Sequence, residues 1–153
     1  FDLSLKGYNP SKIANILTNE NYYAEVPLYT DSLNYIEVLR NNFNYNVDLL
    51  MERVNREAIY NYIYNYDVDK KDEDVYNDIL NEGHIMEKIE ENQNDLIRKR
   101  IEINSYIDSI YNVLVFLRDH PSYNIIDDKL TFLDEENQNI YYELINKTKR
   151  IYE

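Results

Sequence analysis

The chain has 153 residues, no cysteine and a formal net charge of −13 from 29 acidic and 16 basic residues. This length predicts a single domain over 1–153, and the lack of cysteine excludes a disulfide framework and thiolate metal ligands. The acidic balance argues against nucleic-acid binding, because phosphate contacts need Lys and Arg in excess on some surface.

The first predicted element is a short helix over about 10–17. Asn9 suits the cap position and Pro10 suits the first helical turn, so together they favour a helix start. Residues 18–30 show no apolar period and contain Pro27, which favours an irregular connector.

A long helix is predicted over 31–66. Its apolar residues recur at steps of three and four, which is the helical period; they are Leu33, Ile36, Leu39, Phe43, Val47, Leu50, Val54, Ala58, Ile59, Ile63 and Tyr66. The alternating tyrosines between Tyr60 and Tyr66 also fit a strand. We reject the strand, because we find no second strand signal with which it could pair.

The next helix is predicted over 72–118 and carries the most regular pattern in the chain. Alternating steps of four and three connect Val75, Ile79, Glu82, Met86, Ile89, Gln93, Leu96, Arg100, Ile103, Ile107, Ile110, Leu114 and Leu117. Ten of these thirteen residues are apolar, which predicts one buried face about 65 Å long. A kink near Gly83 and His84 stays open, since glycine inside a helix costs about 1 kcal/mol relative to alanine.

The last helix is predicted over 131–152, after a loop over 121–129. Thr131 and Asp134 resemble a capping box at its start. Its predicted buried stripe is Leu133, Asn137, Ile140, Leu144, Thr148 and Ile151.

These elements predict an all-α fold: an elongated antiparallel bundle of three long helices plus the short N-terminal helix, similar to a four-helix bundle. Glu82, Gln93 and Arg100 interrupt the long stripe, and polar residues at such positions usually set helix register. The alternative is that they mark where the bundle opens. If they are internal register devices, replacing Gln93 and Arg100 by Leu should raise the melting temperature.

The sequence offers no assembled catalytic, cofactor or metal site, so we expect no enzyme. His84 lies one helical turn from Glu87 and two from Glu91, but this pattern fits a solvated helix face better than a metal site. His120 is explained by a partial positive charge facing a helix C-terminus. A calcium loop starting at Asp67 fails the EF-hand pattern, because Asp72 stands where glycine is required and Asp78 where glutamate is required.

The 17 tyrosines exceed what a bundle core needs. Codon bias and plain packing can account for this number; the alternative is a tyrosine-rich recognition face. The predicted partner-binding residues lie beside the acidic turn: Tyr60, Tyr62, Tyr64, Tyr66, Asp67, Asp69 and Tyr76. The glycosylation triplet at Asn146 is expected to arise by chance in so asparagine-rich a chain.

The predicted function is macromolecular interaction without catalysis. The bias toward Asn, Ile and Tyr indicates an AT-rich genome, so we predict a secreted or surface protein of an AT-rich, apicomplexan-like pathogen that binds a protein or a host-cell surface. Secreted or surface location is favoured over cytoplasm, and a start at Phe1 fits a processed product or an excised piece. The alternatives are a bundle that opens onto a membrane surface and a structural homo-oligomer, with a monomer favoured.

Overall fold

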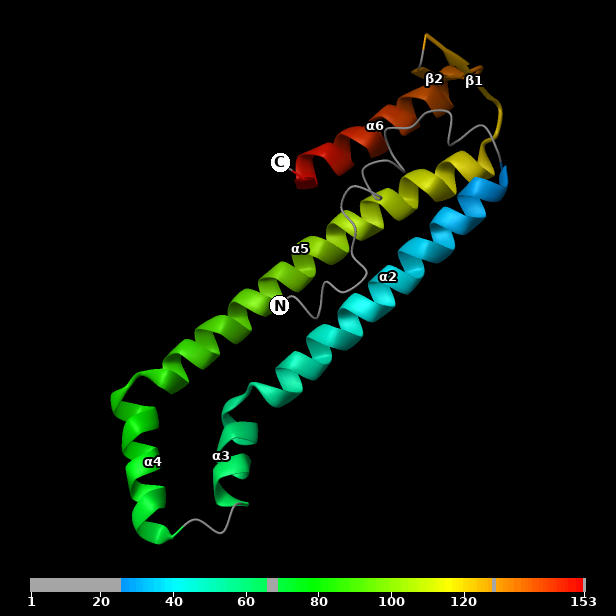
Figure 1. Cartoon of the computed structure of the whole chain (residues 1–153). Helices are drawn as coiled ribbons and strands as arrows, with labels where there is room; N and C mark the ends of the chain where they lie inside the picture. Colours follow the sequence, from blue (N-terminus) through cyan, green and yellow to red (C-terminus); the bar gives the residue numbers. More distant parts are fainter. Residues whose placement is uncertain (1–25, 66–68, 128, 153) are drawn as a thin grey trace. The chain divides into compact units, whose positions relative to one another are not determined.

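The computed structural model describes residues 26–65, 69–127 and 129–152 (Figure 1). In these ranges the elements are α2 (Val26–Arg53), α3 (Arg56–Tyr64), α4 (Lys70–Glu82), α5 (Ile85–Asp119), β1 (Tyr123–Ile126), β2 (Lys129–Phe132) and α6 (Glu135–Tyr152). The chain is mostly helical, as predicted. The predicted short helix over 10–17 lies outside the described residues.

The chain divides into two compact units, one formed by 1–43 with 102–153 and the other by 44–101. We call them the hairpin unit and the α3–α4 unit, and we describe each by itself. The prediction of a single domain stays a prediction.

In the hairpin unit, α2 and α5 run antiparallel. Arg40 of α2 pairs with Asp108 of α5 at 2.5 Å. Glu37, three residues before Arg40, accepts a hydrogen bond from Tyr111, three residues after Asp108. The predicted stripes meet here: Leu33, Ile36 and Leu39 of α2 and Ile107, Ile110, Leu114 and Leu117 of α5 are all buried. Periodicity therefore identified this core correctly.

The start of α2 differs from the prediction. Residues 26–30, which were expected in an irregular connector, form the first turns of the helix, and Tyr29 is buried in the core. Pro27 does not prevent this. Proline lacks a backbone N–H, but N–H groups in the first turn of a helix make no intrahelical hydrogen bond, so nothing is lost there.

A β-hairpin occupies the region predicted as a loop and as the start of the last helix. β1 pairs with β2 antiparallel, with Tyr123 opposite Phe132. The ring of Phe132 contacts the rings of Phe116, Tyr123 and Tyr141 at centroid distances of 5.4 to 5.7 Å, and its backbone N–H donates to Gln138 Oε1. The prediction of a loop over 121–129 was wrong, because packing of this aromatic cluster stabilises two strands too short to give a clear periodic signal.

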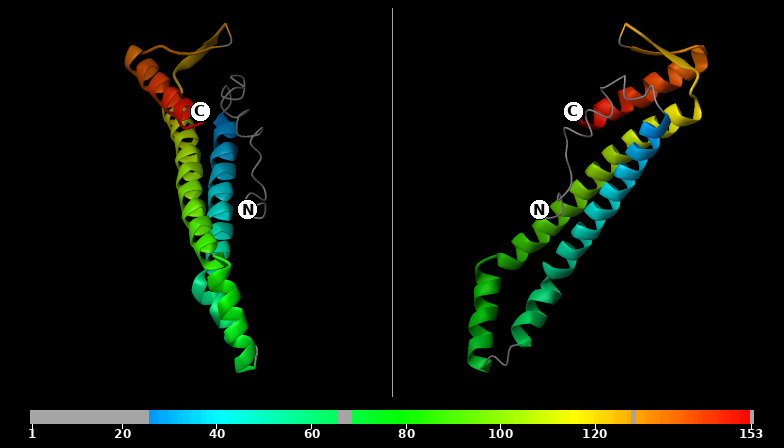
Figure 2. Two further views of the ribbon diagram at one scale, coloured as in Figure 1. Left: turned by 90° about the vertical axis from the view of Figure 1, so that its left-hand side faces the viewer. Right: turned by 45° about the vertical axis from the view of Figure 1, so that its right-hand side comes forward.

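Helix α6 begins later than predicted, and only part of its predicted stripe is buried. Asp134, not Thr131, caps it, because the Asp134 carboxylate accepts from the backbone N–H of Asn137 at 3.2 Å. In Figures 1 and 2 α6 folds back beside the C-terminal part of α5. Its inward positions are Tyr141, Leu144, Ile145 and Thr148; Leu144 and Thr148 were predicted, whereas the predicted Leu133, Ile140 and Ile151 are exposed.

Both long predicted helices are interrupted in the α3–α4 unit. The helix expected over 31–66 breaks at residues 54–55, and the helix expected over 72–118 breaks at Gly83 and His84. The kink that was left open at Gly83 is thus a full break, in which His84 adopts a left-handed φ of 52°. The rejection of a strand near Tyr60 is confirmed, since α3 is helical to Tyr64.

Candidate functional site

Asn55 builds the junction between α2 and α3. Its side-chain oxygen accepts from the backbone N–H of Ala58 at 2.7 Å and so caps the start of α3. Its Nδ2 donates to the carbonyls of Met51 and Glu52, which lie at the end of α2. One amide side chain therefore satisfies backbone groups of both helix ends, which stabilises a break that the periodicity did not indicate.

Gln93 and Arg100 make polar contacts from α5 to the last turns of α2. Gln93 Nε2 donates to the carbonyl of Val54 at 2.8 Å, directly at the break. Arg100 donates to Asn44 at 2.9 Å and to Asp48 at 2.7 Å. Arg100 thus links α5 to α2, and Gln93 links α5 to the residue that follows α2; the register role of both stays a prediction. Glu82 is exposed.

The predicted tyrosine surface is spread over different helix faces. Tyr60 and Tyr64 stack at a centroid distance of 6.2 Å, and the Arg56 guanidinium lies 6.0 Å from the Tyr60 ring. Tyr62 is 66% exposed and lies on another side of α3, since two residues along a helix correspond to about 200°. Tyr66 and Asp67 lie outside the described residues.

Helix α4 carries the other predicted contact residues. Asp69 is exposed and directly precedes the helix, where its carbonyl accepts from the backbone N–H groups of Asp72 and Glu73. Tyr76 is 47% exposed. Within the described part of the chain, the Tyr76 ring does not stack on the tyrosines of α3.

The predicted seam of α4 faces solvent. Val75 is 52% and Ile79 is 53% exposed, and the third seam residue, Glu82, is exposed as well. The inward residues are Leu80, which is buried, and Glu73 and Asn77, which are half-buried. The prediction of one continuous buried face from Val75 to Leu117 was therefore wrong.

The break at Gly83 and His84 explains this change of face. Seam positions on α5 from Met86 onward stay buried or half-buried. On α4 the inward positions are displaced by two residues from the predicted ones, which corresponds to about 200° around a helix. Because two non-helical residues separate the helices, the phase of one no longer sets the phase of the other.

We name the solvent-facing side of α4 the α4 outward face. Helical spacing places five of its residues together: Asp72, Val75, Asp78, Ile79 and Glu82. All five are exposed, and Lys71 lies on the same side at the beginning of the helix. The face thus presents two branched apolar side chains between three carboxylates.

A polar hollow of about 220 Å³ lies in the same unit. Its lining residues are Arg56, Leu80, Asn81, His84, Met86, Glu87 and Glu90. His84 Nδ1 lies 2.8 Å from Glu87, and Arg56 lies 3.6 Å from Glu90. The charged groups here pair with one another. In the described ranges, no group of three His, Asp or Glu side chains is arranged to hold a metal ion.

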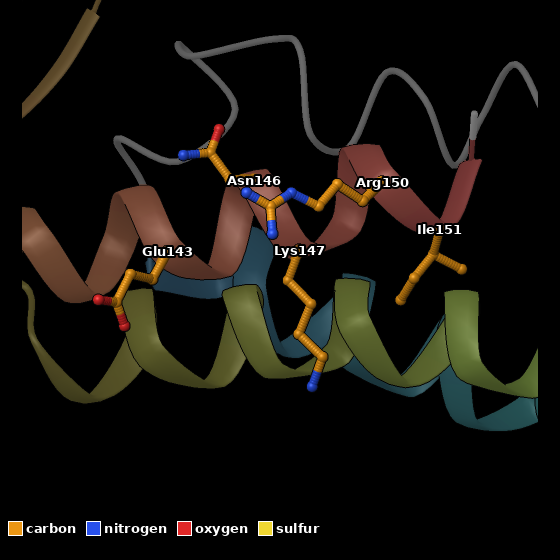
Figure 3. Close-up of a pocket in the computed structure, with 5 residues that line it drawn as sticks. All are labelled: Glu143, Asn146, Lys147, Arg150 and Ile151. Carbon is orange, nitrogen blue, oxygen red and sulfur yellow. The ribbon is translucent and has the colours of Figure 1, made fainter.

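A second hollow, of about 340 Å³, lies along α6 in the hairpin unit (Figure 3). It is lined by Glu143, Asn146, Lys147, Arg150 and Ile151. Two cations and one carboxylate contribute opposing charges, and all five side chains are exposed, so the chemistry favours no single class of ligand. Thr148 of the glycosylation triplet is buried and donates to the Leu144 carbonyl.

Two titratable side chains of the hairpin unit, His120 and Tyr123, make contacts within its fold. His120 follows the last residue of α5, and its Nδ1 lies 3.0 Å from the carbonyl of Phe116. This is the predicted position at a helix C-terminus. Burial raises the pKa of the Tyr123 hydroxyl from 10.0 to about 12, and this hydroxyl is hydrogen-bonded to that of Tyr29. The Tyr29–Tyr123 contact joins β1 to α2, whereas the His120 contact lies within the C-terminal end of α5.

No helix in the described ranges is long and apolar enough to cross a membrane. Comparisons with protein-family models, with curated proteins and with solved structures found no match for this chain.

Proposed function

We propose that this chain binds another protein without catalysing a reaction, and that the α4 outward face is the contact surface. The observation that carries the proposal is the exposure of Val75 and Ile79, at 52% and 53%. Their spacing is that of a helix–helix seam, yet no described part of the chain buries either of them. Apolar side chains grouped on one exposed face are typical of interaction surfaces.

The exposed tyrosines of the same unit support protein binding, but they are not among the residues of the α4 outward face. Tyr62, Tyr64 and Tyr76 are 66%, 51% and 47% exposed. Tyrosine buries a large area at little entropic cost and is enriched at binding hot spots. Secretion and a pathogen source stay predictions.

A peptide display experiment tests the proposal. The whole chain is used to select binders from a random library of helix-forming peptides, and each enriched clone is then assayed against V75S/I79S and against V38S. Val38 is a matched control, because it is 57% exposed on α2 in the other unit. We expect clones whose binding is lost with V75S/I79S and kept with V38S.

Two results would contradict the proposal: no enrichment, or clones that bind both variants equally well. Flotation with phosphatidylcholine vesicles tests the membrane alternative. Binding to these vesicles that depends on Val75 and Ile79 would assign the face to lipid instead of protein.

A further inference from the structure

The α4 outward face carries three carboxylates and one cation, Lys71, among the described residues. Within the described ranges, Asp72, Asp78 and Glu82 form no ion pair. Other carboxylates of the same unit do have partners, since Asp48 pairs with Arg100, Glu90 with Arg56 and Asp95 with Arg98. The acidic charge on α4 is therefore available to a partner.

We propose that the α4 outward face binds a cationic amphipathic helix of another protein; this inference rests on the proposed function. Such a helix would place apolar side chains, spaced three and four residues apart, on Val75 and Ile79. Its flanking Lys or Arg side chains would then meet Asp72, Asp78 and Glu82, in the way that flanking charges select partners in coiled coils.

Charge excludes a second copy of the chain as the preferred occupant. A symmetric contact of this face with itself would bring the carboxylates of both copies together, because a twofold interface uses the same patch twice. Lys71 is the only cation among the described residues on this side of α4, against three carboxylates. Like charges at close range disfavour such a dimer.

The length of α4 bounds the partner and the affinity. Thirteen residues span about 20 Å, so the contacting part of the partner is about four helical turns long. A contact between two helices of this length falls in the range of small, transient interfaces. We therefore expect a dissociation constant in the micromolar range and a marked dependence on salt.

The test uses the whole chain and a labelled 18-residue synthetic peptide with Leu along one helical face and Lys on both flanks. The matched control peptide carries Glu in place of every Lys. Fluorescence anisotropy at 50 and 300 mM NaCl measures both affinities. We expect the Lys peptide to bind at least tenfold more tightly than the Glu peptide at low salt, with the difference reduced at high salt.

Variants separate this site from general attraction to an acidic chain. V75S/I79S and D72N/D78N/E82Q should each weaken binding of the Lys peptide about tenfold or more, because they remove the apolar contact and the charge contact respectively. V38S and D31N/E91Q/E102Q, which alter exposed residues elsewhere, should change it less than twofold. Equal losses in D72N/D78N/E82Q and D31N/E91Q/E102Q would overturn the inference.

Other outcomes distinguish the two proposals. If the Glu peptide binds equally well and V75S/I79S still abolishes binding, the cationic partner is wrong and the proposed function stands. If neither peptide binds, the inference fails. If light scattering shows a dimer that V75S/I79S converts to a monomer, the occupant is a second copy and the inference is overturned.

Discussion

Gly83 allows a test in which the helical pattern and the structure predict opposite signs. A continuous helix through this position predicts that G83A raises the free energy of unfolding by about 1 kcal/mol, because alanine has the higher helix propensity. In the structure, Gly83 ends α4, and a Cβ added there would lie 2.7 Å from the carbonyl oxygen of Ile79 and 3.3 Å from the Ile85 side chain.

The structural argument favours destabilisation. Relief of the contact with Ile79 requires the backbone to move by about 0.7 Å to reach an ordinary separation, against a hydrogen bond from Gly83 N–H to the same oxygen at 3.1 Å. Local backbone strain of this kind costs on the order of 1–3 kcal/mol. Replacing glycine by alanine also lowers the entropy of the unfolded chain, which offsets part of this cost. We therefore expect the free energy of unfolding to fall by about 1 kcal/mol.

Urea unfolding followed by circular dichroism at 222 nm measures the change. N94A is the control, since Asn94 is exposed inside α5 and its replacement should gain a few tenths of a kcal/mol from propensity. H84G is the companion variant and should gain about 0.5–1 kcal/mol, because His84 holds a φ of 52° that glycine adopts freely. A rise of about 1 kcal/mol for G83A would refute the break and restore the continuous helix.

Three further predictions concern the core, the junction and the hairpin. L117A should lower the free energy of unfolding by about 2–5 kcal/mol in urea unfolding, because Leu117 is fully buried, whereas L133A, at a side chain that is 77% exposed, should change it by less than about 0.5 kcal/mol. N55A should lower the free energy of unfolding, measured by thermal unfolding, by about 1–2 kcal/mol, because it removes the side chain that bonds both helix ends. N41A, at an exposed position in α2, is the control, and an equally small effect of both variants would show that this cap does not matter. The raised pKa of Tyr123 keeps its folded hydroxyl protonated from pH 10 to about 12 while the unfolded one ionises, so this residue lowers stability as pH rises through that range. Absorbance at 295 nm should show a tyrosine titrating near pH 12 that is missing in Y123F, and identical titrations would contradict this.

The candidate site was only partly accessible to sequence reasoning. Asp69 and Tyr76, which were predicted as partner-binding residues from their position beside the acidic turn, are exposed, but none of the predicted partner-binding residues is among those of the α4 outward face. Val75 and Ile79 were instead assigned to the core, because an apolar residue at a seam position is normally buried. The signal in the sequence that could have indicated their exposure was Gly83. It lies between Ile79 and Met86, where a break in the helix changes the face on which the following residues lie.

The sequence by itself determined the helical class and the buried stripes of the hairpin unit, from Leu33 to Leu39 on α2 and from Ile107 to Leu117 on α5. Period alone suffices there, since each stripe lies on an unbroken helix. Only the tertiary structure decided the two breaks, the face that α4 buries and the hairpin at Phe132. A periodic pattern specifies which residues share a face while the helix continues, but two non-helical residues reset that phase. Short strands, in turn, form where rings from four separate elements pack together, and such contacts leave no period in the sequence.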